Sequence, residues 1–183
     1  MKKVFLILFF LSIYFYGCSG NPFVFKVEHI IDKSRGVSTV ISNWIPIYNS
    51  NTTLHFPTDV RMEFGFSDSA SVHLYYIDFL YVSGGWAELN ELNLNMDDKV
   101  TRLIPYNQPQ RDAYINNKLQ VFASEAVRFV LDDTTLESFT QAKKIAVGLK
   151  GKVKDFSFSI SDTVKGMFNK FLAESLLQQI NEN

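Results

Sequence analysis

The chain has 183 residues, of which 46% are apolar and 20% charged, with a formal net charge of −1. This composition excludes an intrinsically disordered chain, because disorder requires few apolar residues and a high net charge. The near-neutral balance, with no basic tail or stripe, argues against nucleic acid as a partner. Cys18 is the only cysteine, so no disulfide can form within the chain. We therefore expect a hydrophobic core to hold the fold.

The N-terminal segment has three parts. Lys2 and Lys3 open the chain, an almost unbroken apolar run covers 4–16, and Gly17 then precedes Cys18. A charged start, an apolar run and a small residue are the layout of a secretory signal peptide. As a helix, this run would rise only about 20 Å, whereas a bilayer's hydrocarbon core is about 30 Å thick. The run is therefore too short to span a membrane comfortably.

Gly17 followed by Cys18 resembles the lipobox of bacterial lipoproteins. Phe15 and Tyr16 depart from it, because that family usually carries Leu and a small or aliphatic residue at these positions. The resemblance implies that the thiol of Cys18 is acylated with diacylglycerol and becomes the mature N-terminus. It also implies an extracytoplasmic protein attached by lipid to the cell membrane or the outer membrane.

These features divide the chain into a signal peptide over 1–17, a lipidated tether over 18–22 and a single domain over 23–183. Two alternatives stay open, namely a cleaved soluble secreted protein and an uncleaved anchor. The first would leave Cys18 without a role. The tether is short, polar and prone to turns, which suits a spacer between the lipid and the domain.

The first two thirds of the domain are predicted to be mostly strands, from alternating apolar and polar residues. We expect strands over 23–31, 37–48, 60–65, 72–82, 86–96 and 100–104. Both faces of 72–82 are largely apolar, which predicts a central strand. Pro46 favours an edge position or a break in 37–48, because proline cannot donate to a strand ladder. The segment 105–112 has no periodicity and is predicted to be a loop.

The last third predicts the order strand, helix, strand, strand, helix. The strands are expected over 126–131, 145–149 and 156–160. The first helix is expected to start at Thr134, where Thr134 and Glu137 form a capping-box pattern. Ser161 is expected to cap a terminal helix with one apolar stripe. The fold class is therefore α+β, with a largely antiparallel sheet and the helices packed on one face.

No pattern in the sequence identifies a catalytic site, and we expect no catalytic residue, cofactor or metal. His29, His55 and His73 are the only histidines, and no two of them are spaced as metal ligands on a helix. Cys18 lies at a cleavage boundary with no base beside it, so lipid attachment explains it better than nucleophilic catalysis. No serine lies in a Gly-x-Ser-x-Gly turn.

The aromatic residues supply the one binding hypothesis. Core filling accounts for most of them, but Tyr106, Tyr114 and Trp86 are candidates for contact with a ligand. The expected function is non-catalytic binding of a small ligand or another envelope protein. Two alternatives stay open: an extracytoplasmic hydrolase or carbohydrate-active enzyme whose site residues are scattered in the sequence, and a structural envelope component.

Overall fold

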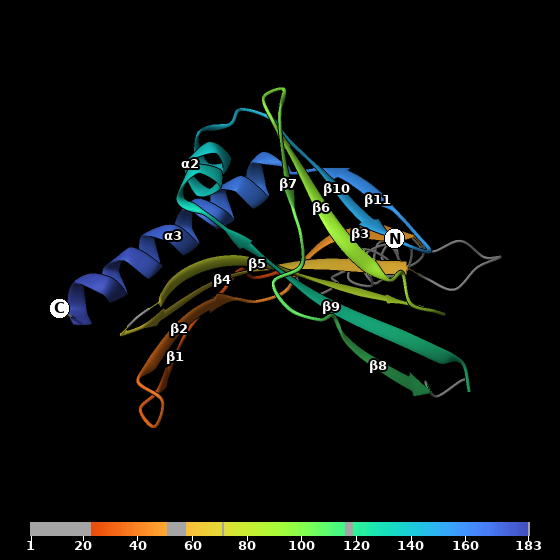
Figure 1. Ribbon diagram of the computed structural model, residues 1–183, viewed down its shortest axis with the longest axis horizontal. Helices are drawn as coiled ribbons and strands as arrows, with labels where there is room; N and C mark the ends of the chain where they lie inside the picture. The colour runs from red at the N-terminus through yellow and green to blue at the C-terminus, as the bar shows by residue number, and fades with distance from the viewer. Residues whose placement is uncertain (1–22, 51–57, 71, 116–118, 183) are drawn as a thin grey trace, which may run out of the picture.

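The computed structural model describes residues 23–50, 58–70, 72–115 and 119–182, which form two antiparallel sheets and two helices (Figure 1). The strands are β1 (Val27–Asp32), β2 (Val37–Ser42), β3 (Ile45–Ser50), β4 (Thr58–Ser69), β5 (Val72–Ser83), β6 (Leu89–Met96), β7 (Lys99–Leu103), β8 (Gln110–Ile115), β9 (Val121–Leu131), β10 (Ile145–Gly151) and β11 (Phe156–Ser159). The helices are α2 (Asp133–Gln141) and α3 (Asp162–Glu182). The α+β class with a mostly antiparallel sheet is confirmed.

The larger sheet, called the main sheet below, has seven strands. Its order is β1-β2-β4-β5-β9-β8, and β3 also pairs with β4. The strand β5 lies between β4 and β9. This is the central position that its two largely apolar faces predict.

The segment 37–48, in which Pro46 favoured an edge position or a break, forms two strands. The chain bends after Ser42, and β3 begins at Ile45. Both β2 and β3 pair with β4, over different parts of its length. The backbone N–H of Phe64 donates to the hydroxyl of Ser42 at 2.9 Å, so a side chain replaces a ladder bond at the bend. Pro46 lies in β3, which among the described strands pairs with β4 alone.

Two further boundaries differ from the sequence prediction. The predicted loop over 105–112 ends in strand β8, which begins at Gln110 and pairs with β9. The strand β9 begins at Val121 instead of Ala126. Its first half carries Glu125 on the buried face, and a charged residue at a core position hides the apolar alternation.

A second layer covers one face of the main sheet (Figure 1). It consists of α2, α3 and a four-stranded sheet in the order β11-β10-β6-β7. Aromatic rings join the layers. Phe168 of α3 packs on Phe64 with ring centroids 4.8 Å apart, and Phe156 of β11 packs on Tyr81 at 5.3 Å. The core therefore lies between the main sheet and this mixed layer.

Side chains cap both helices. Asp132 accepts a hydrogen bond from the backbone N–H of Thr135 at 2.7 Å and is the N-cap of α2. The expected start of this helix at Thr134 is therefore wrong by two residues at the cap. The hydroxyl of Ser161 accepts from the N–H of Val164 at 3.3 Å, at the start of α3.

Neither helix in the described part of the chain is long and apolar enough to cross a membrane.

Candidate functional site

The main sheet has two different ends. One end carries the β1–β2 turn and the β4–β5 turn, and is called the pocket end below. The opposite end carries the hairpin formed by β8 and β9, and is called the hairpin end. The described chain enters β1 from the direction of the hairpin end, since β1 runs toward the β1–β2 turn.

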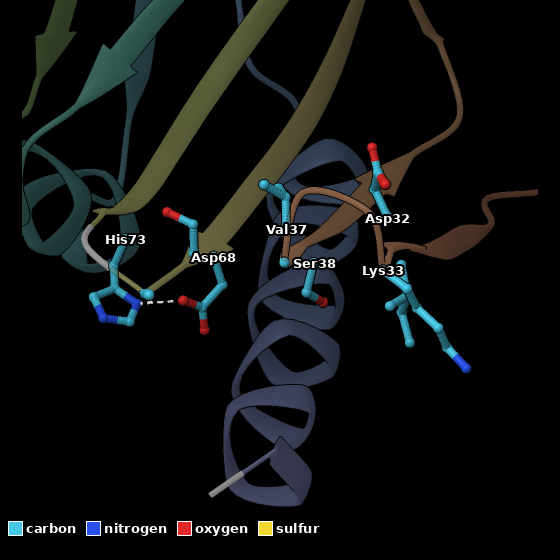
Figure 2. Close-up of a pocket in the computed structure, with 10 residues that line it drawn as sticks. Asp32, Lys33, Val37, Ser38, Asp68 and His73 are labelled. Atoms are coloured by element: carbon cyan, nitrogen blue, oxygen red, sulfur yellow. Dashed lines mark ion pairs between the residues drawn. The ribbon is translucent and has the colours of Figure 1, made fainter.

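Four side chains form one row across the pocket end. Ile31 of β1 pairs with Ser38 of β2, Ser38 pairs with Asp68 of β4, and Asp68 pairs with His73 of β5. Figure 2 shows Ser38, Asp68 and His73 on neighbouring strands, with α3 running beside them. The row lines a pocket of about 890 Å³ together with both turns.

Ser38 is the unusual member of this row. The residue is 7% exposed, and its hydroxyl has no hydrogen-bond partner among the described residues. A buried hydroxyl left without a partner costs about 1–3 kcal/mol, and such groups are rare in native proteins. Ser38 is one of the residues that line the pocket.

Asp68 and His73 form an ion pair at the rim. Nδ1 of His73 lies 2.8 Å from Oδ1 of Asp68. The His73 side chain is 67% exposed, whereas that of Asp68 is 19% exposed. His73 therefore lies at the surface of the protein and outside the aromatic core. The pair places a carboxylate beside Ser38 and an imidazole at the pocket's edge.

The β1–β2 turn forms a fixed wall of the pocket. The carboxylate of Asp32 accepts from the hydroxyl of Ser34 at 2.5 Å and from the backbone N–H groups of Ser34 and Arg35. These bonds, the Ser34 hydroxyl first, lower the pKa of Asp32. Gly36 closes the turn with φ +60, a conformation that favours glycine. Lys33 lines the pocket from the same turn.

The helix α3 is held against the row next to this one. Nδ1 of His29 lies 2.6 Å from Oε1 of Gln178, and the hydroxyl of Tyr75 lies 3.2 Å from that of Ser175. Burial raises the pKa of Tyr75. Side chains of a strand alternate in direction, so residues two positions apart share a face. Ser38 and Asp68 therefore face the same side of the sheet as α3.

A second polar cluster lies on the opposite face of the main sheet. Nε and Nη2 of Arg128 donate to the two carboxylate oxygens of Asp78 at 2.9 and 2.7 Å. The guanidinium lies 3.6 Å from the centroid of the Tyr76 ring. Burial, with the charge of Asp78 next, raises the pKa of neighbouring Glu63 to about 7. The adjacent pocket holds only about 120 Å³, well below the usual size of a ligand site.

The three predicted ligand-contact aromatics are exposed, and none lines the pocket around Ser38. Trp86 lies between β5 and β6. Tyr114 stacks on Phe122 within the β8–β9 hairpin, with ring centroids 5.6 Å apart. Tyr106 lines a separate pocket beside β7. Their role in ligand contact stays a prediction.

Two other residues singled out in the sequence, Cys18 and His55, lie outside the described residues. Within the described ranges, no group of three or more His, Cys, Asp or Glu side chains could hold a metal ion.

The row at the pocket end could not be identified from the sequence. Ser38, Asp68 and His73 match no motif, and only strand register brings them together. Neither a scan of protein-family models nor a search of curated proteins found a match to this chain.

Proposed function

We propose that this protein is a lipid-anchored, extracytoplasmic binding protein that holds a small polar ligand in the pocket end of its main sheet. The observation that carries the proposal is Ser38, a residue of the pocket lining whose buried hydroxyl has no hydrogen-bond partner among the described residues. Buried hydroxyl groups in a structural core are nearly always paired, so an exception beside a pocket supports a role in binding.

The pocket lining indicates the class of ligand. Ser38 can donate and accept, Asp68 accepts, and the ammonium group of Lys33 donates. Ile31 and Val37 add apolar surface to the lining. The volume of about 890 Å³ falls in the range of about 300–1,000 Å³ that is typical of small-molecule sites. The proposed ligand therefore carries several hydroxyl or amide groups, together with some apolar surface.

The order of the row favours binding over hydrolysis. In a serine hydrolase, the histidine lies between the serine and the carboxylate and takes the serine's proton. Here Asp68 lies between Ser38 and His73. Neighbouring strands lie about 4.8 Å apart, so His73 is two strands away from Ser38 and is bound to Asp68. Ser38 therefore has no base to activate it, and we propose no catalytic residue.

The proposed location rests on the N-terminal sequence. The lipid on Cys18 would carry two or three acyl chains, and attachment through more than one chain is stable. The membrane is then the first partner, and the ligand or another envelope protein the second. We further propose that the C-terminal strand–helix–strand–strand–helix segment is the scaffold that supports the pocket. Both of its helices then lie on one face of the main sheet.

A thermal-shift screen tests ligand binding. The purified protein is heated with millimolar hexoses, amino sugars, polyols and amino acids, one class at a time. A ligand present at about 100 times its Kd stabilises the folded state by about 2.7 kcal/mol. For a protein of this size, that corresponds to a rise in Tm of roughly 5–10 °C.

Ser38→Ala is the test variant, and Ser67→Ala is its matched control on the opposite face of the main sheet. We expect the rise in Tm to be lost in Ser38→Ala and kept in Ser67→Ala. An equal rise in both variants would place the ligand elsewhere and contradict the proposed site.

Metabolic labelling with a fatty acid tests the anchor. We expect label in the wild-type chain and none in Cys18→Ala. A wild-type protein without label would contradict lipid attachment while leaving the pocket proposal standing.

A further inference from the structure

Opposite charges lie on the two sides of the pocket around Ser38. Asp68 and His73 line the pocket from β4 and β5, and Lys33 lines it from the β1–β2 turn. Figure 2 shows Lys33 and His73 on opposite sides of Ser38, with Asp68 between Ser38 and His73. The register of β2, β4 and β5 requires the same order. The pocket therefore has an acidic side and a basic side, with Ser38 between them.

The acidic side has a carboxylate oxygen that the fold does not use. Nδ1 of His73 lies 2.8 Å from Oδ1 of Asp68, whereas Oδ2 has no partner among the described residues. The Asp68 side chain is only 19% exposed, so water screens its charge less than at an open surface. A cationic group that reaches Oδ2 would gain a charge-assisted hydrogen bond.

The basic side has an ammonium group that the fold does not use. The neighbouring carboxylate of Asp32 already accepts from Ser34 and Arg35 of the same turn, and the guanidinium of Arg35 pairs with it at 3.6 Å. Lys33 makes no hydrogen bond or ion pair with another described residue. Its ammonium group is therefore available to an anionic group in the pocket.

The two charges together disfavour a ligand that carries a single charge. Asp68 repels an anion that pairs with Lys33, and Lys33 repels a cation that pairs with Asp68. A ligand with both charges in the matching order is attracted at each end. The pocket therefore favours a zwitterion over an anion, a cation or a neutral molecule.

The width of the pocket sets the length of this zwitterion. The strands β1 and β4 lie on either side of β2, so they are about 10 Å apart. The ammonium and carboxylate groups of a single amino acid are bound to one carbon atom and cannot span this width. An extended peptide advances about 3.5 Å per residue, so the termini of a di- or tripeptide lie about 7–10 Å apart.

We infer that the ligand of the pocket is a peptide of two or three residues with both termini free. Its ammonium group binds Asp68, its carboxylate binds Lys33, and its backbone amide lies beside Ser38. Ile31 and Val37, which also line the pocket, contact its side chains. This inference rests on the proposed function and names the ligand class of the same site.

The test measures by calorimetry how tightly the purified protein binds trialanine, a peptide with both termini free. The pH is 7.5, where an ordinary histidine is mostly neutral. N-acetyl-trialanine lacks the ammonium group, and trialanine amide lacks the carboxylate. We expect the free peptide to bind at least about tenfold more tightly than either blocked form, because each block removes one charge-assisted hydrogen bond.

Two variants assign the ends of the peptide. Asp68→Asn should bind the free and the N-acetylated peptide equally and still prefer the free peptide to the amide. Lys33→Gln should bind the free peptide and the amide equally and still prefer the free peptide to the N-acetylated form. Each result is a ratio of affinities within one variant, so an altered stability does not produce it.

Asp112→Asn and Lys26→Gln are the matched controls. Both residues are exposed and lie outside the pocket lining. Each control removes the same charge as its test variant, and each should keep the full preference of the wild type for free termini.

Three results would overturn the inference. The wild type could bind all three peptides equally, trialanine could fail to bind, or Asp68→Asn and Lys33→Gln could leave the preference unchanged. The thermal-shift screen separates these failures from failure of the proposed function. If a sugar or polyol raises the Tm and Ser38→Ala abolishes that rise, the pocket stands and only the peptide assignment fails. If no compound of any class raises the Tm, both proposals fail.

Discussion

Two buried polar side chains at opposite ends of the main sheet differ in one respect. Glu125, toward the hairpin end, is fully buried, and its carboxylate accepts from the backbone N–H of Glu88 at 2.8 Å and of Leu89 at 3.0 Å. Arg111 of β8 adds an ion pair at 3.2 Å. Ser38, at the pocket end, is almost as buried and has no partner among the described residues.

This difference separates a structural role from a binding role. Glu125 joins the hairpin to the start of β6 by accepting hydrogen bonds from two backbone N–H groups there. Ser38 makes no such hydrogen bond to the described residues. A buried polar group with its partners stabilises the fold, whereas one without partners lowers stability. We therefore expect the change in the free energy of unfolding to have opposite signs when each of the two residues is replaced by alanine.

The largest effect is expected at Glu125. Glu125→Ala leaves two backbone N–H groups and the Arg111 guanidinium without their acceptor, which should lower the free energy of unfolding by about 2–4 kcal/mol. Urea denaturation measures the change. Glu125→Gln, which keeps the shape and one acceptor, should lose less. A loss below about 0.5 kcal/mol in Glu125→Ala, the range of an ordinary surface substitution, would contradict the structural role.

A smaller loss is expected in the middle of the main sheet, between the two ends. A Cβ atom on Gly65 would lie 2.0 Å from atoms of the Tyr76 ring. Gly65→Ala must therefore displace this ring and its contact with Arg128. We expect a loss of about 1–3 kcal/mol, as for overpacking elsewhere.

Gly85→Ala is the matched control for this substitution, because a Cβ there meets nothing within 4 Å. Equal Tm values for the two variants would mean that the Tyr76 ring moves aside at no cost, which would contradict the expected loss.

The sequence predicts local structure better than it predicts the site. The apolar faces of β5 and the alternation in β6 and β11 are visible in the sequence, because they depend on residues close together in the chain. Glu125 interrupts the pattern of β9, and its acceptor role depends on Glu88 and Leu89 of another element. Ser38 and Asp68 become neighbours only through strand register, which depends on the whole sheet.

Burial of the Glu63 carboxyl group should make the free energy of unfolding depend on pH. Burial raises the pKa of Glu63 from its ordinary value of 4.5 to about 7. The folded state therefore holds this proton more tightly than the unfolded state. The resulting stabilisation is complete below pH 4.5 and is lost as the pH rises through about 7. The pKa of neighbouring Asp78 is also raised by burial, so it acts in the same direction.

We expect the Glu63 contribution to the free energy of unfolding to fall by about 1 kcal/mol between about pH 5 and about pH 8, after allowance for solvent screening of a partly exposed group. Urea titrations of the wild type and Glu63→Gln measure it. The variant should lack this part of the pH dependence. Identical pH profiles for the two proteins would show that burial of Glu63 has no such effect.

The most direct measurement is the unfolding of Ser38→Ala, in urea and without ligand, beside Ser67→Ala as control. We expect Ser38→Ala to raise the free energy of unfolding by about 1 kcal/mol, because it removes a buried hydroxyl that has no partner among the described residues. The same variant should lose the thermal response to ligand. If Ser38→Ala instead destabilises the protein more than Ser67→Ala does, the hydroxyl contributes to the fold, and the claim that it is kept for a ligand is contradicted.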